Sequence, residues 1–242
     1  MEKVYFYNSR KQKLVGVLHK QGKKGIIVSH GFSSNKENVS IYTKFLQSKG
    51  YSTLAFDYSG HGESEGDITN TTATAWKDDL NTAIDFMGQH CDGIALLGFS
   101  LGGMSSLLCS SRSNATIAIA PPTNFRKLVT HFIKTGLVKK LKEFIDFGGL
   151  SIKHSFITDS AKYDMKKIMK KIKCPILIIH GDEDDIVPLA QSQEIIEYIN
   201  EPKKLVIIEG MTHNVTSADQ MTIIYKEISE WLEKYLYSET RK

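Results

Sequence analysis

Short apolar runs that alternate with helix-like segments are the feature that most constrains this chain. We expect strands at residues 26–28, 51–56, 94–97, 116–120, 176–179 and 205–208, and those at 26–28, 94–97 and 116–120 resemble buried strands. Between several of them apolar residues recur at helical spacing, for example from Trp76 to Met87. Wholly apolar strands are buried on both faces, and strands joined by helices run parallel. The pattern therefore predicts an α/β fold, with a mostly parallel central sheet and helices on both faces.

Both ends of the chain add elements to this pattern. Residues 4–7 and 14–18 flank a polar turn, which predicts a hairpin. Ser217 precedes Ile224, Ile228 and Trp231, whose spacing is helical, so we expect it to cap a final helix. With 242 residues, 41% of them hydrophobic, the chain is long enough for one large α/β domain with a sizeable core.

The alternation stops at Pro121 and Pro122. From about residue 123 to 173 we expect no strand, because apolar residues from Phe125 to Ile145 recur at helical spacing among many lysines. A segment of this length carries little core of its own. We therefore interpret residues 1–242 as a single domain, with a small helical cap inserted at about 122–173. The lysines are expected to form a solvated face, and contact with an anionic membrane surface is the alternative.

Composition and charge argue against several classes of protein. No run of eighteen apolar residues is present, so we expect no membrane span. The first residues lack the apolar core of a signal peptide, which predicts a cytoplasmic location. The 3 cysteines are far apart and fit neither a disulfide framework nor a zinc site. The net charge of +4 is mild and comes mostly from lysine, so we do not expect nucleic-acid binding.

One predicted strand-to-helix junction carries a reactive side chain. Gly98-Phe99-Ser100-Leu101-Gly102 follows the apolar run 94–97 and precedes a segment that can continue as a helix. Glycines two residues before and after a serine permit a strained turn, because side chains there would collide. The Gly-x-Ser-x-Gly arrangement predicts a nucleophile elbow, which projects the Ser100 hydroxyl above the edge of the sheet. The amide of Leu101 is expected to point at the same space.

Two further strand ends carry the partners that a reactive serine needs. The chain reads His-Gly-Asp-Glu-Asp-Asp-Ile-Val-Pro from residue 180, and His213 follows the run 205–208. A loop histidine is suited to take the serine proton and return it to a leaving group. The order serine, aspartate, histidine is that of the α/β-hydrolases, and the chain resembles those of the serine esterase and lipase type from residue 26 to the final helix.

This resemblance implies the roles of several residues. The motif His-Gly-x-x-Asp-x-x-Val-Pro implies Asp184 as the acid, with Asp182 and Asp185 as rivals. His30 and His180 each precede a glycine at a strand end, so structural hydrogen bonds are expected for them rather than catalysis.

An oxyanion hole of two backbone amides completes the site that the resemblance implies. One amide is that of Leu101, and the other is that of Phe32, which follows His30-Gly31. The single Gly followed by Phe resembles the corresponding sequence of cinnamoyl (feruloyl) esterases and monoacylglycerol lipases. The implied mechanism is that of a serine hydrolase, and it requires no metal and no organic cofactor.

The expected function is therefore cleavage of carboxylic esters through an acyl-enzyme on Ser100. A carboxylesterase that acts on small or aromatic (cinnamoyl-type) esters is the favoured reading, and a monoacylglycerol lipase or thioesterase is the alternative. A hydrolase fold that binds a small ligand without turnover is the alternative from another class. The expected partner is a small-molecule ester. The sequence leaves the natural ester and the oligomeric state open.

Overall fold

The computed structural model describes residues 1–136, 139–140, 144–147, 150–215 and 217–236. Its main sheet is eight-stranded, in the order β1-β2-β4-β3-β5-β6-β10-β11. These strands are β1 (Glu2–Tyr7), β2 (Lys13–His19), β3 (Lys24–Ser29), β4 (Ser52–Phe56), β5 (Gly93–Phe99), β6 (Ala115–Ile119), β10 (Ile176–Gly181) and β11 (Lys203–Ile208). β1 and β2 pair antiparallel, and from β4 to β11 neighbouring strands are parallel. The predicted hairpin and mostly parallel sheet are confirmed.

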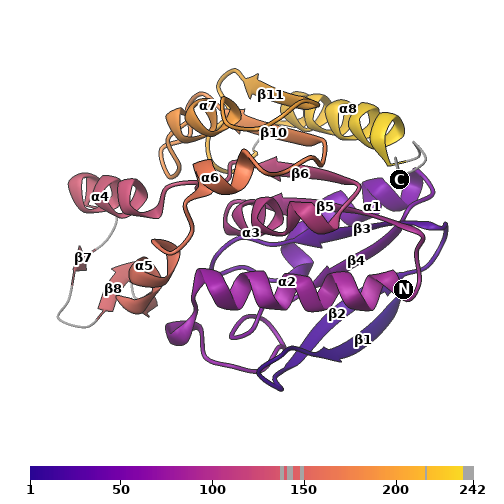
Figure 1. Ribbon diagram of the computed structural model, residues 1–242, viewed down its shortest axis with the longest axis horizontal. Helices are drawn as coiled ribbons and strands as arrows, with labels where there is room; N and C mark the ends of the chain where they lie inside the picture. Colours follow the sequence, from indigo (N-terminus) through magenta and orange to yellow (C-terminus); the bar gives the residue numbers. More distant parts are fainter. Residues whose placement is uncertain (137–138, 141–143, 148–149, 216, 237–242) are drawn as a thin grey trace.

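Helices cover both faces of this sheet (Figure 1). Side chains along a strand alternate between two cores: Ile27 packs into one, whereas Ile26 and Val28 pack into the other. The first core includes side chains of α2 (Ala73–Gly88), α3 (Leu101–Cys109) and α7 (Ala190–Ile196). The second includes side chains of α1 (Ser40–Ser48) and α8 (Ala218–Tyr235). Short 3₁₀ helices are η1 (Lys36–Val39), η2 (Ile68–Asn70) and η3 (Ser110–Arg112).

The final helix α8 begins where the sequence predicts. Ser217 is its N-cap, and the Ser217 hydroxyl accepts a hydrogen bond from the backbone N–H of Asp219. Three apolar side chains of α8 pack in the second core, at the helical spacing found in the sequence: Ile224, Ile228 and Trp231.

The segment between β6 and β10 mixes helices with short strands. It contains α4 (Phe125–Thr135), β7 (Lys139–Lys140), β8 (Phe144–Phe147), β9 (Leu150–Lys153), α5 (Ser155–Ser160) and α6 (Met165–Met169). The prediction of a segment without strands is wrong, because β8 pairs antiparallel with β9. Ile145 and Ile152 face each other and are buried, while their neighbours Asp146 and Ser151 are partly exposed. Strands of four residues are too short for their period of two to stand out from helical spacing.

Polar contacts hold this segment against the sheet domain. The Gln191 side chain of α7 accepts hydrogen bonds from the amides of residues 123 and 124, at the start of α4. Glu194 of α7 binds Lys127 of α4 at 3.0 Å and Lys166 of α6 at 2.6 Å. Figure 1 shows α4, β8 and α5 together at one end of the molecule. We call the segment between β6 and β10 the cap.

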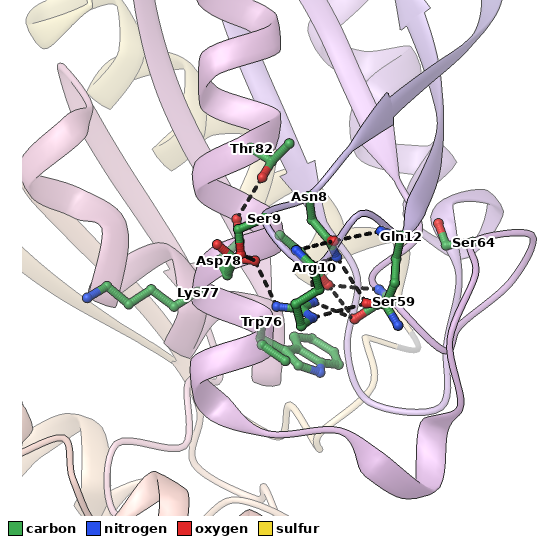
Figure 2. Close-up of polar contacts among 12 residues, drawn as sticks. Asn8, Ser9, Arg10, Gln12, Ser59, Ser64, Trp76, Lys77, Asp78 and Thr82 are labelled. Carbon is green, nitrogen blue, oxygen red and sulfur yellow. Dashed lines mark hydrogen bonds and ion pairs between the residues drawn. The ribbon is translucent and has the colours of Figure 1, made fainter.

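A polar cluster ties the hairpin to α2 (Figure 2). Arg10, in the turn between β1 and β2, binds Asp78 at 2.7 Å and the fully buried Asp79 at 2.5 Å. The second oxygen of Asp79 accepts hydrogen bonds from the amide and hydroxyl of Ser59, which follows β4. The cluster therefore connects the antiparallel hairpin to the parallel part of the fold.

Candidate active site

Ser100 lies in a strained turn between β5 and α3. Its φ is 54° and its ψ is −120°, a conformation that L-residues rarely adopt. A Cβ on Gly98 would lie 2.1 Å from the carbonyl oxygen of Gly102, and a Cβ on Gly102 would lie 2.5 Å from the carbonyl oxygens of Ser29 and His30. Both positions must therefore be glycine for α3 to pack this closely on β3 and β5. The strained strand-to-helix turn that the sequence predicts is present.

A chain of hydrogen bonds runs from Ser100 to Asp184. His213 Nε2 lies 3.1 Å from Ser100 Oγ, and His213 Nδ1 lies 2.8 Å from Asp184 Oδ2. The backbone N–H groups of Ile186 and Val187 donate to Asp184 Oδ1, at 3.0 and 2.7 Å. All three residues are buried. The loops after β5, β10 and β11 thus meet at the carboxyl edge of the sheet, as parallel strands require.

Asp184 is held as a carboxylate in this chain. Burial works to raise its pKa, but hydrogen bonding to His180 and His213 and the Val187 amide holds the pKa of Asp184 well below its usual value. The rival acids lie elsewhere in the loop: Asp182 accepts a hydrogen bond from the amide of Gly210, and the backbone oxygen of Asp185 lies 2.9 Å from His131 Nε2. Of the three candidate acids, the structure brings Asp184 to His213.

His30 orients the peptide group that joins Gly31 to Phe32. His30 Nε2 accepts a hydrogen bond from the amide of Tyr58 at 3.2 Å, so Nδ1 carries the proton and donates to the carbonyl oxygen of Gly31 at 2.7 Å. In a trans peptide the N–H points opposite to the C=O, so the amide of Phe32 points away from His30. Burial, reinforced by His61 and Lys36 and opposed by the Gly31 bond, lowers the pKa of His30 to about 3. His30 is therefore a neutral structural residue, as expected.

A buried ion-pair cluster supports the same loop, and the sequence reasoning missed it. Lys36, with 3% of its side chain exposed, binds the fully buried Asp57 at 2.8 Å and Glu63 at 2.7 Å. The amides of Lys36 and Glu63 also donate to the Asp57 carboxylate. A charged residue directly after a buried strand, as Asp57 is after β4, was the available signal. The cluster anchors the end of the loop that carries Phe32.

An apolar pocket opens above Ser100. Its volume is about 390 Å³. Ser100, His213, Phe32 and Leu101 all line it. Cap side chains form one wall, and they are Phe125, Leu128, Val129 and Phe132 from α4, Ile152 from β9 and Phe156 from α5. The exposed residues Ser33, Asn38 and Asn214 also line the pocket. The lining of the pocket therefore combines apolar side chains from the cap with a few exposed polar residues.

The described part of the chain also bears on metal and membrane binding. Within those residues, no group of three or more His, Cys, Asp or Glu side chains is placed to hold a metal ion. Among the helices that the structure describes, none is long and apolar enough to cross a membrane.

The sequence and the fold match known hydrolases. The family model described as "Serine aminopeptidase, S33" matches residues 20–163 and 158–220. The mitochondrial palmitoyl-protein thioesterase ABHD10 of Rattus norvegicus is 26% identical in an alignment of length 227 that covers 87% of this chain and 75% of the relative.

Two solved structures have a similar fold. One is alpha/beta hydrolase domain-containing protein 10 from mouse, with a TM-score of 0.81 and 23% identity over 97% of this chain and 99% of that one. The other is Est1E from Butyrivibrio proteoclasticus with bound ferulic acid, with a TM-score of 0.84 and 23% identity over 97% of this chain and 100% of that one. Since the family model covers most of the sequence, the chain is an α/β hydrolase and belongs to the family described as serine aminopeptidase, S33.

Proposed function

We propose that this chain hydrolyses carboxylic esters or thioesters through an acyl-enzyme on Ser100. The observation that carries the proposal is the hydrogen-bonded chain Ser100–His213–Asp184 at the base of an apolar pocket. His213 Nε2 takes the proton of Ser100 Oγ as that oxygen attacks the substrate carbonyl, and then gives the proton to the leaving group. Asp184 holds the imidazole in the tautomer that has its proton on Nδ1. Water then cleaves the acyl-enzyme by the reverse proton transfers.

The amides of Leu101 and Phe32 are the proposed oxyanion hole. Leu101 is the first residue of α3, where backbone N–H groups have no carbonyl one turn earlier to bind. The hydrogen bond from His30 to the Gly31 carbonyl supports the orientation proposed for the Phe32 amide. The loss of one such donor costs about 10²–10³ in kcat.

The pocket supports an apolar acyl group and a more polar leaving group. The apolar cap wall suits an acyl chain or an aromatic ring, because both gain from burial. The exposed polar residues of the lining suit an alcohol or thiol that must return to water. Small or aromatic acyl groups, including cinnamoyl-type ones, are the proposed esters. The ferulic acid bound to Est1E favours aromatic acyl groups, and the name of the rat relative favours thioesters as the second candidate.

Aminopeptidase activity, which the family description names, has little support in this pocket. A peptide substrate would present a free α-ammonium group near the scissile bond, and a buried ammonium needs a carboxylate partner. Among the described residues that line the pocket, none is Asp or Glu. We therefore propose that esters and thioesters are cleaved far faster than aminoacyl anilides.

A substrate panel with one variant tests the proposal. Purified wild type and Ser100→Ala are given nitrophenyl esters of increasing acyl length, a methyl hydroxycinnamate, an acyl thioester and an aminoacyl anilide. Ser100→Ala should lose about 10⁴–10⁶ in kcat. A fluorophosphonate should add its phosphonyl group to wild type and not to Ser100→Ala, as measured by intact-protein mass. Equal rates for the two proteins would refute the catalytic role of Ser100 and favour a ligand-binding protein.

Substrate preference is tested on the cap wall. Phe132→Ala should raise KM for medium-chain and hydroxycinnamoyl esters and leave acetyl esters almost unchanged, because a short acyl group does not reach α4. Activity on aliphatic esters with none on hydroxycinnamates would overturn the cinnamoyl preference. A cytoplasmic location also stays a proposal, although the rat relative is named as mitochondrial, and immunodetection in fractionated cells tests it.

A further inference from the structure

A second histidine approaches the same oxygen of Asp184 that His213 binds. His180, at the end of β10, is fully buried. Its Nε2 lies 3.1 Å from Asp184 Oδ2 and 2.9 Å from the carbonyl oxygen of Val187. A ring nitrogen without a proton would direct a lone pair at two oxygens, which is repulsive. His180 Nε2 therefore carries a proton.

Ser192 of α7 fixes this tautomer from the other side of the ring. Ser192 Oγ lies 2.7 Å from His180 Nδ1, and both side chains are fully buried. In the imidazole tautomer that has its proton on Nε2, Nδ1 is an acceptor. The Ser192 hydroxyl must then be the donor. The order of donation is thus Ser192 to His180, with the Nε2–H of His180 directed at Val187 O and Asp184 Oδ2.

The groups that face Asp184 come from several elements. His213 approaches from the loop after β11 and His180 from β10, while the amides of residues 186 and 187 come from its own loop. His131 of α4 contacts the backbone of this loop at Asp185, and Asp182 is bound to the amide of residue 210. Within the described residues, His180 and His213 are the titratable side chains in ion-pair contact with Asp184.

In this arrangement Asp184 Oδ2 accepts hydrogen bonds from two imidazole N–H groups, those of His180 and His213. Each donor makes the oxygen a weaker base. If His180 were absent, Oδ2 would hold the Nδ1 proton of His213 more strongly, and the imidazolium would be more stable. His213 would then keep its second proton to a higher pH and fail as a base over a wider acidic range.

We propose that His180 and Ser192 are positioning residues for the reaction, which hold Asp184 Oδ2 in place and limit how strongly it attracts the proton of His213. The inference rests on the proposed function, because it assigns the role through His213. It treats His180 as more than a structural histidine at a strand end.

The test is the pH profile of kcat/KM between pH 5 and 9 on a nitrophenyl ester. Ser192→Ala removes the donor that polarises His180, and His180→Leu removes the Nε2–H. Both variants should move the acid limb upward, by about 0.5 pH unit or more. His180→Gln can place an amide N–H near the position of Nε2, so its limb should stay close to that of wild type. The plateau of kcat should fall less than about tenfold, because Asp184 Oδ1 keeps its two amide donors.

Ser110→Ala is the matched control for Ser192→Ala. Ser110 is fully buried and its hydroxyl donates to the Leu107 carbonyl at 2.7 Å, at the far end of α3. This variant should lose stability without moving the acid limb. Fluorophosphonate titration gives the concentration of reactive sites, so kcat refers to intact protein only.

The outcomes separate the inference from the proposed function. If Ser192→Ala keeps the wild-type acid limb while it hydrolyses the ester, His180 and Ser192 are merely structural and the inference is overturned. This result does not depend on whether His180→Leu folds. If the wild type neither hydrolyses esters nor reacts with fluorophosphonate, the proposed function fails and the inference fails with it.

Discussion

Lys36→Met is the change whose consequence can be worked out most fully. The Lys36 ammonium lies within 2.9 Å of three carboxylates, those of Asp57, Glu63 and Glu37. Burial works against its charge, but these partners raise the pKa of Lys36 above its usual value. Methionine keeps most of the volume and removes the charge. The fully buried Asp57 carboxylate then loses its counter-ion.

The contacts of Asp57 determine how much stability Lys36→Met loses. Removing one partner of a buried ion pair typically costs about 3–5 kcal/mol. Asp57 keeps two amide donors, those of Lys36 at 2.7 Å and Glu63 at 2.9 Å, so we expect a value near the lower end, about 3 kcal/mol. For a chain of this length that corresponds to a fall in Tm of about 6–12 °C. Activity should also fall, because the loop that carries Phe32 loses its anchor.

Lys3→Met is the control, because Lys3 binds the other oxygen of the same Glu63 carboxylate at 2.5 Å. The Lys3 side chain is 46% exposed and that of Lys36 is 3% exposed. An exposed pair contributes about 0–1 kcal/mol. Urea unfolding followed by circular dichroism gives the free energy of unfolding for each variant. If Lys36→Met and Lys3→Met lose the same amount within error, burial does not set the size of the loss and the reasoning is wrong.

Two further perturbations test the fold around the site. Gly102→Ala should abolish activity and destabilise the fold by about 3 kcal/mol or more, because the added Cβ meets the backbone oxygens of Ser29, in β3, and of His30, which follows it. Gly88→Ala is the control: a Cβ there meets nothing within 4 Å, so activity and stability should stay unchanged or improve slightly. Equal behaviour of the two variants would contradict the tight turn at Ser100. Acid should destabilise the fold below pH 6.5, because burial lowers the pKa of His30 to about 3 and also lowers that of His61. The pKa values of the two histidines are lower in the folded protein than in the unfolded chain. The stability that their neutral forms contribute is therefore fully present above pH 6.5 and is lost as the pH falls. Free energies of unfolding from urea titrations at pH 7.5 and 5 should differ by about 2 kcal/mol. Equal free energies at the two pH values would contradict the burial of His30 in its neutral form.

Local patterns in the sequence predicted most of the sheet. Runs rich in apolar residues predicted the parallel strands to within a few residues, because a strand covered on both faces tolerates few polar side chains. The run at 205–208 forms the edge strand β11, which is only partly buried. Strands β8 and β9 escaped prediction, since pairing between four-residue segments is decided by tertiary contact.

The candidate site was predictable where a motif fixes a residue's place at a strand end. Ser100, Asp184 and His213 meet as the chain order implies, while their catalytic roles stay proposals. The contacts of Lys36 with Asp57 and of Ser192 with His180 were not predictable. Each joins side chains that are distant along the chain or on different elements, and no local pattern says which partner a residue will meet.

The order of strands in the sheet makes Ser100, Asp184 and His213 unequally resistant to local unfolding. Ser100 follows β5, which is paired on both sides, whereas His213 follows β11, which among the described strands pairs with β10 alone and forms an edge of the sheet. Edge elements open locally at a lower free energy than the centre of a sheet. Mild heat or denaturant should therefore detach the base while the nucleophile stays in its ordered turn. Such a protein is inactive but still folded at its centre, and it can regain activity by re-pairing one strand.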